Sequence, residues 1–182
     1  GHGGRRQANR GRRQARRGGG MAGDGAVTEP NGQQDPFGRD PFERERDQIA
    51  ALLIEPLLGN AQGILPRPGF LQGVRDLTTE FGALLIFDEV KTGFRLARGG
   101  AAELFGITPD LACYAKAMGN GYPAAAFGGR REVMSMLPTE VSHGGTYAGN
   151  RVAASAATAV LRELRDTDVI ADVGRTGLRV QA

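Results

Sequence analysis

The chain has 182 residues, of which 40% are hydrophobic and 24% charged, a length that suits one domain with an additional segment. No apolar run approaches the roughly 20 residues that cross a bilayer, and the start lacks the apolar core of a signal peptide. We therefore expect a cytoplasmic protein without a membrane span. One cysteine excludes an internal disulfide or a multi-cysteine metal site, and with two histidines there is little to bind zinc, so we expect no metal.

Positive charge is concentrated at the start of the chain. Residues 1–20 contain seven arginines and no acidic residue. The whole chain has a net charge of +3, yet after residue 20 there are 16 basic and 20 acidic residues, so the remaining body is acidic. The chain has two lysines, Lys91 and Lys116, against 21 arginines, which makes each lysine a candidate for a specific role.

Residues 1–41 are predicted to form a tail without a packed core. Residues 1–20 are a low-complexity Arg/Gly/Gln stretch, for which we expect disorder, and residues 21–41 are rich in Gly, Pro and Asp, which indicates a linker. An Arg-rich tail could bind RNA, with an affinity that falls steeply with salt. No Phe or Tyr lies among these arginines, so we favour a gene-start artefact, with Met21 as a candidate true start, and expect no nucleic-acid partner.

Helix and strand patterns alternate after the tail. A short charged helix over residues 41–48 is followed by an apolar run, Ile49 to Ile54, which fits a strand buried on both faces. Apolar positions at helical spacing predict a helix over 70–81, and the apolar run at 83–90 predicts a second buried strand that ends in two carboxylates. Further strands are predicted over 108–116 and 124–129, and further helices over 100–106, 130–137 and 151–164.

This alternation predicts an α/β fold with a mostly parallel sheet and flanking helices. In open sheets of this kind, ligands bind beyond the carboxyl ends of the strands. The predicted strand ends carry Glu55, then Asp88 and Glu89, then Lys116. Lys116 lies in a small, apolar turn, and a partly desolvated lysine is suited to forming Schiff bases.

Asp88 follows five apolar residues, so its carboxylate needs a cationic partner if its burial is not to be costly. A protonated pyridine nitrogen would be such a partner. The residue pattern alone indicates a nucleophilic lysine and a buried carboxylate in one pocket. It leaves open that Asp88 is a structural cap and Lys116 an ordinary surface lysine.

Three other residues have simple structural interpretations. His143 lies in a Gly-rich loop, and we interpret it as a local hydrogen-bonding residue rather than a catalyst. Cys113 lies within a predicted strand and fits a small buried side chain. Glu89 could polarise the site or only bind neighbouring backbone, and both interpretations stay open.

Three motifs carry a resemblance to a known family. IFDEVKTGFR (86–95), TPDLACYAKAMGNGYPAAAFGG (108–129) and HGGTYAGN (143–150) closely resemble the class III (subgroup II) aminotransferases of pyridoxal-phosphate (PLP) fold type I. The branch they resemble includes glutamate-1-semialdehyde 2,1-aminomutase. The resemblance implies that residues 42–165 are part of the large domain of the fold type I PLP transferases, and that residues 166–182 begin a small domain.

The resemblance implies roles for four residues. Asp88 matches the aspartate that pairs with the pyridinium nitrogen and keeps it protonated, so that the ring acts as an electron sink. Val90 matches the apolar residue that packs on one face of the ring. Lys116 matches the lysine that forms the Schiff base and carries the proton. Thr146 matches the threonine that reaches the cofactor phosphate of the neighbouring subunit, which implies a homodimer.

The activity implied is that of a PLP-dependent aminotransferase, which moves an amino group between an amino donor and an oxo acid or aldehyde. The alternative is glutamate-1-semialdehyde 2,1-aminomutase, in which the amino group moves within one molecule. Asn60 stands where relatives that act on ornithine or γ-aminobutyrate have glutamate, which disfavours those substrates. Family members are much longer, and we find neither their phosphate-binding loop before Glu55 nor their complete small domain. We therefore expect a fragment that is inactive by itself.

Overall fold

The computed structural model describes residues 27–28, 34–35, 37–137 and 140–181. The chain divides into two compact units, Gly1–Asp35 and Pro36–Ala182. The tail predicted over residues 1–20 lies outside the described residues, as does most of the predicted linker. The domain boundaries after residues 41 and 165 stay predictions.

The first unit contains a short antiparallel ribbon in the stretch that was predicted to be a linker. It pairs β1 (Val27–Thr28) with β2 (Gln34–Asp35).

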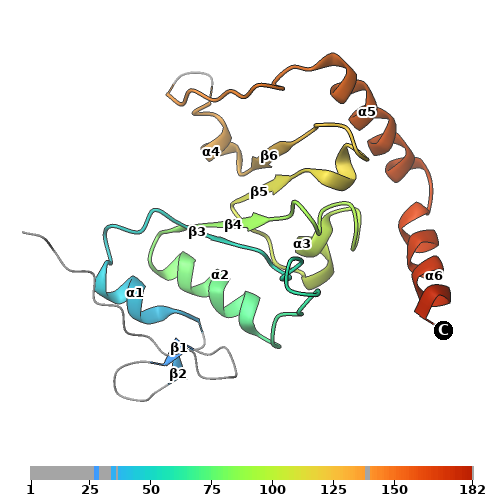
Figure 1. Ribbon diagram of the computed structural model, residues 1–182. Helices are drawn as coiled ribbons and strands as arrows, with labels where there is room; N and C mark the ends of the chain where they lie inside the picture. Colours follow the sequence, from blue (N-terminus) through green and yellow to red (C-terminus); the bar gives the residue numbers. More distant parts are fainter. Residues whose placement is uncertain (1–26, 29–33, 36, 138–139, 182) are drawn as a thin grey trace, which may run out of the picture. The chain divides into compact units, whose positions relative to one another are not determined.

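The second unit is built on a four-stranded sheet in the order β3-β4-β5-β6 (Figure 1). β3 (Ala51–Ile54), β4 (Leu84–Asp88) and β5 (Leu111–Tyr114) are parallel, whereas β6 (Ala126–Gly129) is antiparallel to β5. The prediction of a mostly parallel sheet is therefore confirmed, and the four strands lie within the predicted apolar runs.

Helices flank the sheet in the described part of this unit. They are α1 (Arg39–Arg44), α2 (Phe70–Glu80), α3 (Gly100–Phe105), a 3-10 turn η1 (Lys116–Met118), α4 (Arg131–Met134), α5 (Arg151–Asp166) and α6 (Val169–Gln181). The α5 helix begins where predicted because the Asn150 side chain accepts a hydrogen bond from the Ala153 N–H (2.9 Å) and so caps the first turn. None of the described helices is long and apolar enough to cross a membrane.

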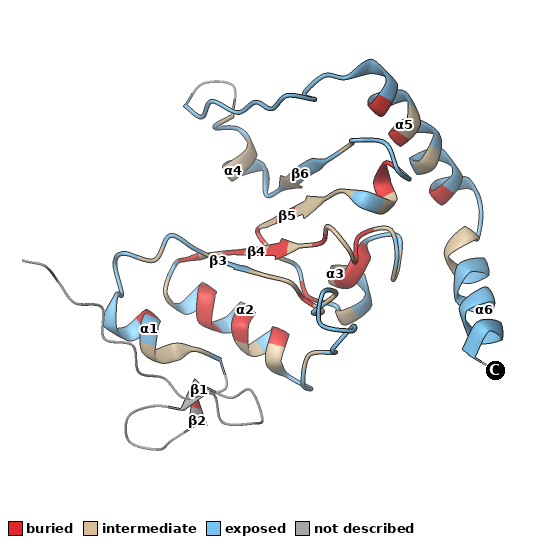
Figure 2. Ribbon diagram, in the orientation of Figure 1, coloured by how far each residue is buried: buried red, intermediate tan, exposed pale blue. Residues whose placement is uncertain are grey.

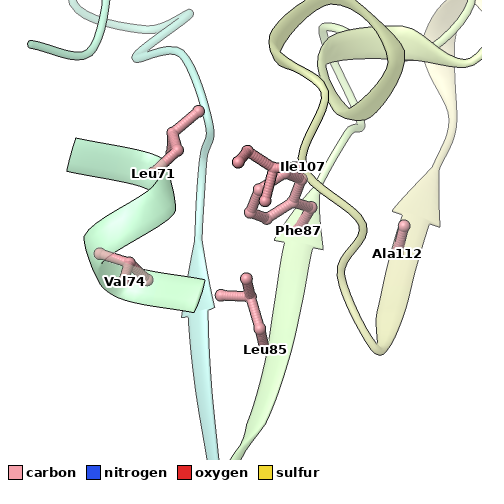
Figure 3. Packing of buried hydrophobic residues seen from close by; sticks show 6 residues of the cluster. All are labelled: Leu71, Val74, Leu85, Phe87, Ile107 and Ala112. Carbon is pink, nitrogen blue, oxygen red and sulfur yellow. The ribbon is translucent and has the colours of Figure 1, made fainter. Parts of the chain in front are cut away.

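The core lies between α2 and one face of the sheet. Leu71 and Val74 of α2 form one cluster with Leu85 and Phe87 of β4, both of which have 0% exposure (Figure 3). Burial of a side chain of this size stabilises the fold by about 1.5–3 kcal/mol. Ala112 of β5 belongs to the same cluster, so the core fixes β4 and β5 together.

The opposite face of the sheet is open. Side chains alternate between the two faces along a strand, and on this face Leu53 of β3 is 61% exposed and Phe127 of β6 is 47% exposed. Figure 2 shows β6 coloured as exposed and intermediate, with no buried residue. Ile86 and Cys113, between them, are only half-buried. The prediction that β3 is buried on both faces is wrong for this chain, because no element of the described residues covers its second face.

We predict that the two faces respond oppositely to substitution. Leu85→Ala should destabilise the chain by about 3 kcal/mol, because it leaves a cavity in the core. Leu53→Lys should change the free energy of unfolding by less than about 0.5 kcal/mol. It should also reduce self-association and the binding of a hydrophobic dye, because it breaks up the exposed apolar face. Urea unfolding, light scattering and dye fluorescence check this. Equal destabilisation by the two variants would show that the open face is covered in solution.

A buried carboxylate just before β5 binds α2, β4 and the residue between β6 and α4. Asp110 is 4% exposed, and its Oδ2 accepts hydrogen bonds from Arg75 Nη1 and the Leu85 N–H (both 2.8 Å). Its Oδ1 accepts one from Arg130 Nη1 (3.0 Å). Burial alone would raise the pKa of Asp110, but these donors outweigh it and hold the pKa below the ordinary value of 3.8.

We predict that Asp110→Asn destabilises the chain by about 2–3 kcal/mol at about pH 7, because it removes the charge that Arg75 and Arg130 face. The pKa of Asp110 is lower in the folded state than in the unfolded state. The stabilisation is therefore complete well above pH 3.8 and is lost as the pH falls through the folded pKa. Urea unfolding at several pH values should thus show the gap between wild type and variant closing in acid.

The matched control is Asp76→Asn, because Asp76 is exposed and accepts its hydrogen bond from the exposed Gln72 side chain. It should change stability by less than about 0.5 kcal/mol. If the difference in the free energy of unfolding between wild type and Asp110→Asn stays constant with pH, the stabilisation does not come from the Asp110 charge.

Candidate active site

The carboxyl ends of β4 and β5 place Asp88 and Lys116 at one edge of the sheet. Asp88 is the last residue of β4 and pairs with Cys113 of β5. Lys116 follows the end of β5 after one intervening residue, Ala115. Because the two strands are parallel and adjacent, the structure brings these two predicted site residues to the same edge.

The Asp88 carboxylate lies half-buried at the end of β4. Its Oδ1 accepts a hydrogen bond from the Val90 N–H (3.0 Å), which fixes the carboxylate against the turn after β4. It forms no ion pair within the described ranges. Burial, and then the negative charge of Asp88, raise the pKa of the neighbouring Cys113 thiol. This carboxylate can therefore accept a cation.

The turn after β4 is packed against Tyr114 of β5. The Gly93 N–H donates to the Glu89 carbonyl (2.8 Å), so residues 89–93 form a tight turn that carries the half-buried Val90. A Cβ on Gly93 would lie 2.6 Å from Tyr114 Cδ1, too close to be accommodated without a shift. The ring of the next residue, Phe94, packs against that of Tyr114 in a tilted arrangement, with 5.3 Å between the ring centroids. The contacts of Gly93 and Phe94 with Tyr114 therefore fix the turn that carries Val90 against β5.

Lys116 has a strained backbone and an exposed side chain. Its φ of +43° lies in the left-handed region, which costs a residue with a side chain about 1–2 kcal/mol. Its carbonyl accepts from the N–H groups of Gly119 (3.0 Å) and Asn120 (2.9 Å), and these bonds close the turn. A Cβ on Gly119 would lie 2.5 Å from the Tyr122 carbonyl oxygen, so the turn needs glycine there. Strain of this kind is concentrated at functional sites.

The amine of the other lysine, Lys91, is hydrogen-bonded to the backbone. Lys91 Nζ donates to the Gly59 carbonyl (3.1 Å), and the Gly59 N–H in turn donates to Glu55 Oε2 (3.1 Å). A Cβ on Gly59 would lie 2.6 Å from Lys91 Cδ, so the stem of Lys91 lies directly on that backbone. The amine of Lys116, by contrast, has no hydrogen-bond or ion-pair partner in the part of the chain that the structure describes. No local sequence pattern indicates the hydrogen bond from Lys91 to Gly59, which are 32 residues apart.

The other carboxylate of the predicted strand end, Glu89, is directed into the protein. It is 0% exposed and accepts hydrogen bonds from the N–H groups of Ala101 (2.9 Å) and Ala102 (2.7 Å). Of the two interpretations left open by the sequence, the structure therefore supports binding to neighbouring backbone.

Thr146 and His143 lie in an exposed segment, residues 141–150. No hydrogen bond among the described residues connects Thr146 to Asp88 or Lys116, so its role at a cofactor phosphate stays a prediction. The His143 ring lies edge-on against Phe127 at 6.0 Å, which is a ring contact and not the local hydrogen bond that was predicted. Cys113 is half-buried on the open face, less covered than predicted.

The residues at this edge fit PLP. A half-buried carboxylate without a cationic partner suits a protonated pyridine nitrogen, and an exposed, uncommitted amine suits the cofactor aldehyde. The described residues hold no cluster of metal-ligating side chains.

Comparisons with known proteins agree with this chemistry. Residues 33–182 match the family model described as aminotransferase class-III. The chain is 55% identical over 122 residues to a glutamate-1-semialdehyde 2,1-aminomutase from Syntrophobacter fumaroxidans, a match that covers 66% of this chain and 28% of that protein. It is 46% identical over 142 residues to one from Pelotomaculum thermopropionicum, covering 77% of this chain and 33% of that protein.

Among solved structures, a transaminase with PLP bound matches with a TM-score of 0.64 and 30% identity, over 75% of this chain and 32% of that one. The chain thus spans about a third of the length of the relatives it matches. Because the family model matches most of its residues, the chain belongs to the class III aminotransferase family.

Proposed function

We propose that the protein carrying this chain is a PLP-dependent aminotransferase, which transfers an amino group between an amino donor and an oxo acid or aldehyde. The observation that carries the proposal is the pairing of two uncommitted groups on adjacent strand ends: the Asp88 carboxylate and the Lys116 amine. Membership of the family and the likeness to a transaminase with PLP bound support the choice of cofactor.

Asp88, Val90 and Lys116 have separate roles in the proposed reaction. When bound, PLP supplies an electron sink for the electron pair left on the reacting carbon of the substrate. Asp88 would hold a proton on the pyridine nitrogen, which would keep the ring electron-poor, and Val90 would pack against one ring face. The Lys116 amine would hold the cofactor through its aldehyde carbon, with loss of water. Once displaced by the substrate amine, it would carry the proton to or from the substrate carbon.

The proposal extends to the partner and the location. Thr146 is exposed on a Gly-containing segment, as expected of a residue that reaches a phosphate in the neighbouring subunit of a homodimer. We place the enzyme in the cytoplasm, with small molecules as its substrates.

Glutamate-1-semialdehyde 2,1-aminomutase is the second candidate. The identities of 46% and 55% to proteins of that name favour it. The two activities share the cofactor and the lysine, so the discriminating experiment is net transfer of an amino group to pyruvate or 2-oxoglutarate. An aminotransferase requires such an acceptor and an aminomutase does not.

We predict that Lys116 is the residue that PLP modifies. Borohydride reduction of the intact protein loaded with PLP, followed by peptide mass analysis, should place the pyridoxyl group on Lys116. Lys116→Ala should abolish the label, because the amine of Lys91, the other lysine of this chain, is bound to the Gly59 carbonyl. Lys91→Arg is the control and should keep the label, since Lys91 is tied to the Gly59 carbonyl. Label on Lys91 would refute the site.

We predict that Asp88→Asn retains PLP but loses turnover. The substitution keeps the shape of the side chain and the acceptor for the Val90 N–H, but removes the charge that holds the pyridine proton. Loss of one transition-state charge of this kind costs about 3 kcal/mol or more, which lowers the rate by at least about a hundredfold. Single-turnover kinetics with PLP-saturated protein check this. Near-normal rates would show that the carboxylate is structural.

A further inference from the structure

Glu89 is a fully buried carboxylate directly after the proposed cofactor ligand Asp88. Its side chain accepts hydrogen bonds from the Thr92 hydroxyl and from the N–H groups of Ala101 (2.9 Å) and Ala102 (2.7 Å). It forms no ion pair with a described residue. A charge buried in this way is tolerated because hydrogen bonds from three donors compensate for the loss of water.

These contacts join both ends of one chain segment. The segment over residues 90–100 leaves β4 after Asp88 and returns at the first residues of α3. The Glu89 carboxylate links its beginning, at Thr92, to its end, at Ala101 and Ala102. The Glu89 N–H also donates to the Cys113 carbonyl (3.0 Å), which extends the pairing of β4 and β5 by one residue.

The backbone around Glu89 is adapted to this carboxylate. Gly100 has a φ of +69°, and a Cβ there would lie 2.5 Å from Glu89 Oε2. Glycine is needed at this position both for the left-handed conformation and for the close approach. The Thr92 side chain, also buried, directs its hydroxyl at the same oxygen.

We propose that Glu89 is a positioning residue for the cofactor site: by closing the 90–100 segment, its carboxylate fixes the turn that presents Asp88 and Val90 to the ring. The inference rests on the proposed function. Glu89 acts through the backbone of this turn. The Val90 N–H donates a hydrogen bond to Asp88 Oδ1, and the Gly93 N–H donates one to the Glu89 carbonyl. It touches neither cofactor nor substrate.

The test compares Glu89→Gln with Glu89→Asp in the intact protein. In Glu89→Gln one oxygen becomes an NH2 group, which faces backbone N–H groups and cannot accept from them. We expect PLP affinity to fall at least about tenfold, and the visible circular dichroism per bound PLP to fall with it, because the ring is no longer held in one orientation. Glu89→Asp keeps the charge but is one methylene shorter, and should give intermediate values.

The matched control is Glu103→Gln. Glu103 also accepts a hydrogen bond from a backbone N–H near the start of α3, that of Gly99 (2.6 Å), but it is exposed and binds within its own segment rather than to the turn after Asp88. It should leave PLP affinity and circular dichroism unchanged. If Glu89→Gln lowers only the melting temperature, with both PLP readouts at wild-type values in the folded range, Glu89 is a structural residue and the inference is overturned.

If Glu89→Gln does not fold, Thr92→Val decides, because it removes one of the three donors and keeps the shape. A fall in both PLP readouts supports the inference, and unchanged readouts overturn it. A wild-type protein that binds no PLP would overturn the proposed function itself, whereas a wild type that binds PLP beside an unaffected Glu89→Gln overturns only the role of Glu89.

Discussion

The parallel pairing of β4 with β5 is the constraint on which the fold and the site both depend. With Asp88 opposite Cys113, the carboxyl ends of the two strands coincide, and the turn of Lys116 begins beside the turn of Val90. Leu85 and Phe87 point into the core on one face, so alternation places Asp88 on the other. A slip of one residue would put Asp88 into the core and Phe87 at the open edge, so the core fixes the site.

Three carboxylates near this sheet differ in how their charge is compensated, and that difference separates their roles. Asp110 is held by two guanidinium groups and a backbone N–H, and Glu89 by a hydroxyl and two backbone N–H groups. Within the described part of the chain, Asp88 has one hydrogen-bond donor, the N–H of Val90. Because a half-buried carboxylate gains most from a cation when it has few donors, Asp88 is the one of the three suited to a ligand.

The sequence was sufficient for the four strands of the main sheet, for α2 and α5 and for the two strand-end residues, because apolar runs and helical spacing are local signals. The helix α6 was not predicted. It failed where the outcome depends on distant residues. Asp110 meets Arg75 and Arg130, which are 35 and 20 residues away, and no local pattern announces those pairs. The apolar run of β3 likewise does not reveal how many of its faces this chain covers. The Glu89 side chain points into the protein because its hydrogen-bond donors, the N–H groups of Ala101 and Ala102, lie in α3, where the chain comes back to the end of β4.

The open face and the site are coupled through Asp88, which shares that face with Ile86 and Cys113. Any layer that covers the face withdraws water from the Asp88 carboxylate. Without a cation this burial is costly, whereas with a pyridinium beside it the attraction strengthens as the local dielectric falls. Covering the sheet and binding the cofactor therefore favour each other. By linkage, the covering layer raises the affinity for the cofactor by the same factor as the cofactor raises the affinity for the covering layer.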